Sequence, residues 1–68
     1  MVVSYKKLWH ILLDKDMKKK DLIELAGINE YTIKKLSRNK SVSIETLGKI
    51  SKALGCTIDD IVEFHEEE

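Results

Sequence analysis

The sequence predicts a small all-helical (all-α) domain of five helices, and three observations support this prediction. One local pattern recurs five times: an apolar residue, a capping position, three further residues and a second apolar residue. In this hydrophobic staple, the residue before the N-cap packs on the fourth helical residue. No proline interrupts the chain, and no segment alternates apolar and polar residues for long enough to predict a strand. The 68 residues are enough for one domain with a small core.

The five copies of the pattern predict where the helices begin. They are Val3-Ser4…Leu8, Met17-Lys18…Leu22, Ile28-Asn29…Ile33, Val42-Ser43…Leu47 and Cys56-Thr57…Ile61. Four capping positions carry Ser, Asn or Thr, whose side chains accept hydrogen bonds from free helix N–H groups, whereas Lys18 is a poor cap. The predicted helices span about residues 5–15, 19–26, 30–37, 44–54 and 58–64. Gly27, Asn39 and Gly55 are the predicted stops of the second, third and fourth helices.

Each predicted helix carries an apolar stripe at helical spacing, and these stripes form the expected core. The inward residues are Tyr5, Leu8, Trp9, Leu12 and Leu13, then Leu22, Leu25 and Ala26, then Ile33 and Leu36, then Ile44, Leu47, Ile50 and Leu54, and finally Ile58, Ile61 and Val62. We therefore expect a single domain over residues 1–68, with an ordered core at about 5–64 and an acidic tail at 65–68.

Composition argues against several classes of protein. Cys56 cannot form an internal disulfide or, with only His10 and His65, a zinc site, and a lone cysteine suits a reducing cytoplasm. No run of 18 apolar residues predicts a membrane span, and the first residues lack the features of a signal peptide. No nucleophile–base or carboxylate pair has a plausible site. We expect no enzyme, no cofactor, no metal and no small-molecule substrate.

The net charge is zero, but its distribution is uneven. Residues 1–40 carry ten Lys and Arg against five Asp and Glu, while residues 41–68 carry two against seven. Such asymmetry is typical of a nucleic-acid-facing side joined to an acidic tail. A solvated surface with a soluble tail explains the same charges, so charge alone leaves both interpretations open.

The segment 18–38 predicts a helix-turn-helix. Two helices meet across a short link containing Gly27, and the second begins at once with the cap Asn29. The apolar residues of this segment hold the angle between the helices and leave the polar face of residues 30–35 outside. In the DNA-binding form of this motif, the second helix enters the major groove with its N-terminal residues against base edges.

These residues resemble the Cro/repressor-like, xenobiotic-response-element (XRE) type of helix-turn-helix, in the subgroup of small bacterial and phage regulators. The resemblance covers about residues 5–64 and is carried by Leu22, Gly27, Ile28, Ile33 and Leu36, with support from the segments 5–9, 42–47 and 50–61. It implies a compact, five-helix, lambda-repressor-like domain. It also implies a sequence-specific regulator of transcription, a repressor, that binds double-stranded DNA as a homodimer. Ile23 departs from the family pattern, which has a small residue there, and suggests a different helix approach.

Three lysines at the start of the second predicted helix, Lys18, Lys19 and Lys20, are locally unfavourable because they add to the positive end of the helix dipole. Local unfavourable charge of this kind often marks a functional site. DNA phosphate would relieve the repulsion and accept the free N–H groups. The alternative is a solubilising lysine run that Asp21 partly compensates.

The resemblance also assigns roles on the third predicted helix. Glu30, Tyr31, Thr32 and Lys35 match the positions that meet bases: Lys35 can donate to guanine, Glu30 can accept from cytosine, and Thr32 can touch a thymine methyl group. The expected phosphate contacts beyond the three lysines are Lys34, Arg38, Asn39 and Lys40. A rival hypothesis keeps the fold but loses DNA binding, as in an antitoxin-like protein-interaction module, and zero net charge and Glu30 favour it.

Overall fold

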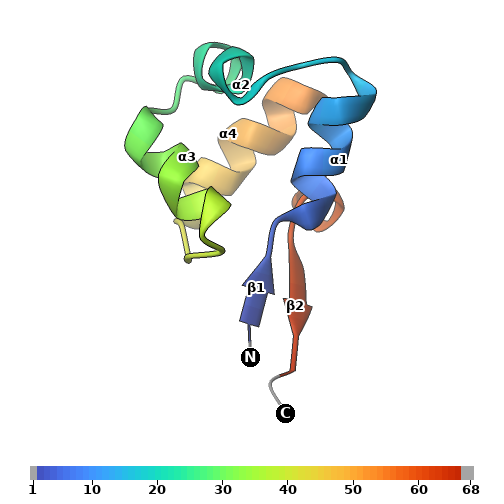
Figure 1. Cartoon of the computed structure of the whole chain (residues 1–68), viewed down its shortest axis with the longest axis vertical. Helices are drawn as coiled ribbons and strands as arrows, with labels where there is room; N and C mark the ends of the chain where they lie inside the picture. The colour runs from blue at the N-terminus through green and yellow to red at the C-terminus, as the bar shows by residue number, and fades with distance from the viewer. Residues whose placement is uncertain (1, 67–68) are drawn as a thin grey trace.

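Four helices surround one core, and the two ends of the chain meet in a short ribbon (Figure 1). The computed structural model describes residues 2–66. The elements in chain order are β1 (Val2–Ser4), α1 (Lys6–Asp14), α2 (Lys19–Ala26), α3 (Glu30–Ser37), α4 (Ile44–Leu54), the 3₁₀ turn η1 (Ile58–Asp60) and β2 (Glu63–His65). None of the helices in this described part is long and apolar enough to cross a membrane.

The prediction of a fifth helix over residues 58–64, and hence of an all-helical fold, is wrong. Thr57 and Asp60 do form the expected cap, because the Thr57 N–H and hydroxyl both donate to the Asp60 carboxylate at 3.0 Å. Only one 3₁₀ turn follows it. The chain then extends as β2 and pairs antiparallel with β1, with Val3 opposite Phe64. A helix this short is marginal on its own, so pairing with a distant segment decides its structure.

The caps of α3 and α4 are those that the sequence predicts. The Asn29 side chain accepts from the Thr32 N–H at 2.9 Å, and the Ser43 hydroxyl accepts from the Thr46 N–H at 3.1 Å. The cap predicted at Ser4 is displaced: α1 begins after Tyr5, and the Ser4 hydroxyl accepts only the Lys6 N–H at 3.3 Å.

Replacing the α3 cap should destabilise the fold measurably. We expect Asn29→Ala to lower the free energy of unfolding by about 1 kcal/mol, because the Thr32 N–H loses its acceptor. Urea unfolding followed by far-ultraviolet circular dichroism measures this change. Asn29→Asp keeps an acceptor and is the matched control, and equal losses for the two variants would contradict the capping role.

Each of the four helices is followed, within two residues, by a residue with positive φ. Gly27 and Gly55 have a φ of 68°, and Asn39 has a φ of 55°, as the predicted stops require. The fourth such residue, Asp16, has a φ of 56° and was not predicted from the sequence. After each one, the next N–H bonds back to a carbonyl five residues earlier, as from Ile28 to Ile23 at 3.2 Å. This arrangement satisfies carbonyls that a helix end leaves free.

The core contains most of the predicted inward residues, but three predictions of burial are wrong. Leu13, Leu25 and Ile44 are 75, 57 and 76% exposed. Residues of a helix are 100° apart around its axis, so Leu13 points well away from the line that the buried residues of α1 follow. Trp9, predicted as core, is half-buried against it. The fully or largely buried apolar residues are Tyr5, Leu8, Leu12, Leu22, Ala26, Ile33, Leu36, Leu47, Ile50, Leu54, Ile61 and Val62.

On α2, Ile23 packs where Leu25 was expected. Ile23 is half-buried against the core, while Leu25 on the opposite side of Leu22 faces solvent. The helix is therefore rotated relative to the predicted stripe. The departure at Ile23 is accommodated by this rotation, and α2 still packs on both α3 and α4.

Candidate nucleic-acid interface

The turn between α2 and α3 has the short geometry that a helix-turn-helix needs. Only Gly27, Ile28 and Asn29 separate the two helices. Gly27 ends α2 in the left-handed conformation, which lets the chain turn tightly into α3 and which few residues with a side chain adopt without strain. Ile28 packs partly against the core, and Asn29 caps α3. Residues 30–37 therefore begin a helix directly beside α2, with Ile33 and Leu36 buried beneath it.

Five side chains at the outer face and end of α3 line one basic groove. The groove has a volume of about 300 Å³ and is formed by Tyr31, Lys34, Lys35, Arg38 and Lys40. All five belong to the residues expected to contact bases or phosphates. Four cations without a carboxylate among the lining residues attract an anion, and one aromatic ring can stack or donate a hydrogen bond.

Within this groove, Lys35 and Tyr31 act as a pair. The Lys35 ammonium lies 5.2 Å from the centre of the Tyr31 ring, and the two residues are one helical turn apart. A cation over an aromatic face is weakly attracted to it. Tyr31 is 67% exposed, whereas Lys35 is half-buried. The ring therefore limits where the Lys35 ammonium can lie.

Thr32 and Glu30 are placed differently from these two residues. The Thr32 N–H and hydroxyl both donate to the Asn29 amide oxygen, at 2.9 and 3.0 Å, so the polar part of Thr32 serves the cap. The methyl group remains as the part of Thr32 suited to a base contact. Glu30 is exposed in the first turn of α3, where a negative charge is favourable to the helix dipole.

At the start of α2, Asp21 relieves part of the lysine repulsion. Its carboxylate accepts the Lys18 N–H at 2.9 Å and brings a negative charge to the first turn. This is the compensation that the alternative interpretation of the lysine run requires. The Lys18 side chain has no acceptor and cannot complete a capping box. Lys18, Lys19 and Lys20 are all exposed.

Lys19 joins three helices. Its ammonium lies 4.6 Å from the centre of the Trp9 ring of α1 and donates to the Ser37 hydroxyl of α3 at 3.0 Å. The start of α2 therefore lies beside the end of α3, next to Arg38. Trp9 and Ser37 were not predicted as neighbours of the lysine run, because no local spacing in the sequence relates them to Lys19.

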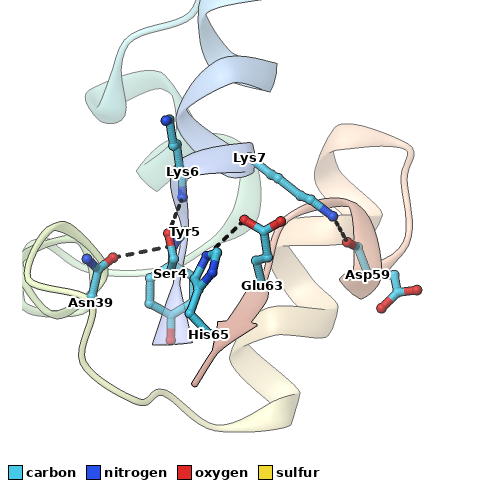
Figure 2. A network of polar contacts seen from close by, with 8 residues as sticks. All are labelled: Ser4, Tyr5, Lys6, Lys7, Asn39, Asp59, Glu63 and His65. Atoms are coloured by element: carbon cyan, nitrogen blue, oxygen red, sulfur yellow. Dashed lines mark hydrogen bonds and ion pairs between the residues drawn. The ribbon is translucent and has the colours of Figure 1, made fainter. Parts of the chain in front are cut away.

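The loop from α3 to α4 is held by Tyr5, which the sequence analysis assigned only to the core. The Tyr5 hydroxyl donates to the Lys40 carbonyl at 2.7 Å, and the Tyr5 N–H donates to the Asn39 amide oxygen at 3.3 Å. Figure 2 shows the Asn39 amide nitrogen directed away from this bond. The Asn39 amide oxygen thus accepts a hydrogen bond within the fold, while the amide nitrogen is the group left to donate in the expected phosphate contact. Tyr5 is 1% exposed, so this link to the loop starts in the core.

Removing the Tyr5 hydroxyl should loosen the loop that carries Asn39 and Lys40. We expect Tyr5→Phe to lower the free energy of unfolding by about 1 kcal/mol, because the bond to the Lys40 carbonyl is lost while the ring stays. Burial raises the pKa of the Tyr5 phenol, so the folded state holds this proton more tightly than the unfolded state does. Its contribution to stability is present below about pH 10 and is lost as pH rises through the folded pKa.

Urea unfolding at pH 7 and at alkaline pH measures both effects. The variant should lose the Tyr5 component of alkaline destabilisation. Tyr31→Phe, at an exposed ring, is the matched control and should behave like the unmodified protein. An equal response of the two variants would contradict the role of the buried hydroxyl.

The other candidate residues lie outside this surface. His10 and His65 are exposed, and Cys56 is half-buried. Burial raises the pKa of the Cys56 thiol and so disfavours its reactive thiolate. Within residues 2–66 no three metal-ligating side chains of the His, Cys, Asp or Glu type come together.

Comparisons with known proteins agree with this geometry. A search of curated proteins found no match. Among solved structures, the chain is similar to one described as "transcriptional regulator VanUg, Form II", with 44% sequence identity and a TM-score of 0.91. The similarity covers 97% of this chain and 88% of that one. The model of the Cro/C1-type helix-turn-helix DNA-binding domain matches residues 7–67, and the chain therefore belongs to the Cro/C1-type helix-turn-helix family.

Proposed function

We propose that the protein is a sequence-specific transcriptional regulator, a repressor, which inserts α3 into the major groove of double-stranded DNA. The observation that carries this proposal is the basic groove of Tyr31, Lys34, Lys35, Arg38 and Lys40 on α3 and the loop after it. In this family fold, a helix presenting both cations and hydrogen-bonding side chains suits base edges and the phosphates beside them. A repressor of this kind would act by occupying an operator.

Base contact falls to the first turns of α3 in this proposal. Lys35 donates to guanine, Glu30 accepts from cytosine, the Thr32 methyl group touches thymine, and Tyr31 contacts a base edge or phosphate. The phosphate contacts come from both sides of α3. The expected phosphate-binding residues are Lys18, Lys19, Lys20, Lys34, Arg38, Asn39 and Lys40.

We also propose that the protein binds as a homodimer to a two-fold symmetric site. One helix of eight residues reads only a short half-site, and pairing two copies on one duplex raises the affinity without new contacts in each half. The spacing of the half-sites would follow from the dimer.

Selection of bound sequences from random double-stranded DNA tests the proposal, followed by titration of a selected and a random duplex between 50 and 200 mM salt. We expect an enriched site with two-fold symmetry and an affinity that falls steeply with salt, by about 0.9 in log–log slope for each phosphate contact. Arg38→Ala should reduce this slope by about 1, while Lys49→Ala on α4 should not. Absence of binding to any duplex at low salt would favour the rival protein-interaction module.

A further inference from the structure

The ribbon of β1 and β2 is short and is made of only two strands. Each strand has three residues, and a two-stranded ribbon is marginal in water unless other structure supports it. Figure 1 shows the ribbon extending below the helices, with β1 on one side of β2 and no other segment on its other side. Apart from the pairing of β1 with β2, no backbone hydrogen bond within residues 2–66 involves either strand. The outer edge of β2 is therefore free to pair.

One face of the ribbon is apolar. Val3 and Phe64 are directly opposite each other, so their side chains lie on the same face. Val3 packs against the core, whereas Phe64 is 63% exposed. The Phe64 ring thus extends the apolar surface beyond what this chain covers. The edge carries neither lysine nor proline, although it is short and bears the charged residue Glu63.

The other face of β2 carries an acid and an imidazole. Glu63 and His65 are two residues apart, so they share the face opposite Phe64. The His65 ring nitrogen Nε2 lies 3.2 Å from the Glu63 carboxylate (Figure 2). The strand therefore carries an acid, an apolar ring and an imidazole in that order. If two such strands ran antiparallel, the acid of each would lie opposite the imidazole of the other.

We propose that β2 pairs antiparallel with β2 of a second copy of this chain, with the two-fold axis at Phe64. The product is a four-stranded sheet in the order β1, β2, β2, β1. In this register Phe64 faces its own copy, and an apolar row of Val3, Phe64, Phe64 and Val3 crosses the sheet. On the other face, each Glu63 lies opposite His65 of the second copy, so one acid–imidazole pair lies on each side of the axis.

Pairing through the alternative edge, on β1, would cover less of the exposed apolar surface. Pairing through β1 would place Val3 against its copy, although Val3 is already half-buried. The two Phe64 rings would stay exposed on the outer strands, three strand spacings or about 14 Å apart. The loop from α3 to α4 also contacts the chain at Tyr5, directly after β1. The β2 edge is therefore the better match for a second copy.

This surface assigns a face to the proposed homodimer and rests on that part of the proposed function. Its test uses free protein without DNA, so its failure is distinct from failure of DNA binding. Three paired residues on each chain make a small interface, and such interfaces are weak. We expect association at micromolar or higher protein concentration.

Cysteine crosslinking distinguishes the two edges. In a Cys56→Ser background, Phe64→Cys places two thiols directly opposite each other, with Cα atoms about 5 Å apart, which suits a disulfide. Val3→Cys would do so only if β1 were the paired edge. Under mild oxidation we expect Phe64→Cys to form a disulfide-linked dimer at least tenfold faster than Val3→Cys. The reverse order, or equal slow rates for both, would overturn the proposal.

Sedimentation at several protein concentrations supplies a second measurement without crosslinking. Phe64→Lys puts like charges opposite each other at the axis and should weaken association at least tenfold. Ile44→Lys changes another exposed apolar residue, at 76% against 63% for Phe64, and should leave association unchanged. Circular dichroism verifies that both variants fold. A protein that stays monomeric to millimolar concentration, or that associates less in the Ile44 variant, would overturn the proposal.

Discussion

Leu22→Ala should remove a large share of the free energy of unfolding, whereas Leu25→Ala should leave it almost unchanged. Both leucines belong to α2, three residues apart, but Leu22 is completely buried and Leu25 is 57% exposed. Removing a buried leucine side chain costs about 2–5 kcal/mol, because apolar contacts are lost and a cavity remains. The total stability of a domain of this length is only about 3–10 kcal/mol.

Urea and thermal unfolding of the two variants measure this difference. We expect a loss of about 3 kcal/mol for Leu22→Ala and less than about 0.5 kcal/mol for Leu25→Ala. Leu22→Ala should lose DNA binding at the lower temperature or urea concentration at which it unfolds, while Leu25→Ala should bind like the unmodified chain. Similar losses in the two variants would contradict the rotation of α2 described above.

The helices illustrate which features of the fold can be predicted from the sequence. Helix starts and ends depend on local residues, so the caps at Asn29 and Ser43 and the stops at Gly27 and Gly55 were predicted correctly. The rotation of a helix depends on its neighbours in space. The choice between Ile23 and Leu25 as the inward residue therefore could not be made from α2 alone, since they flank Leu22 on opposite sides and either can extend its apolar stripe.

The ends of the chain show the same division between local and distant effects. The cap at Thr57 was predicted, but the helix after it was not formed. Pairing of Glu63–His65 with Val2–Ser4 joins segments about sixty residues apart, and neither three-residue segment shows an alternating pattern long enough to predict a strand. Short strands of this kind are decided by tertiary contacts rather than by their own sequence.

In the candidate site, the structure brings several of the predicted residues together, and their contact with DNA stays a prediction. The groove at α3 brings together five side chains that the family resemblance had selected. The supports of that surface, Tyr5 beneath the loop and Trp9 beneath Lys19, come from the N-terminal part of the chain. Their roles depend on long-range packing, for which the sequence carries no local spacing.

Two adjacent lysines should affect DNA binding in different ways. Lys35 is half-buried and directed by Tyr31, whereas Lys34 is exposed. If Lys35 contacts a base, Lys35→Ala should weaken binding to the selected site about 10–100-fold and relax the preference at one base pair. If Lys34 contacts only phosphate, Lys34→Ala should weaken binding to selected and random duplexes by similar factors and lower the salt slope by about 1.

Titration of each variant against the selected duplex, its single-base variants and a random duplex separates these effects. Tyr31→Leu retains Lys35 but removes the ring that limits where its ammonium can lie. It should therefore reduce base preference more than it reduces binding to random DNA. Tyr31→Phe keeps the ring and should retain most of the preference that depends on Lys35. If Lys34→Ala and Lys35→Ala lowered the affinities for all duplexes equally, Lys35 would be a phosphate contact, and base recognition would fall to Glu30, Tyr31 and Thr32.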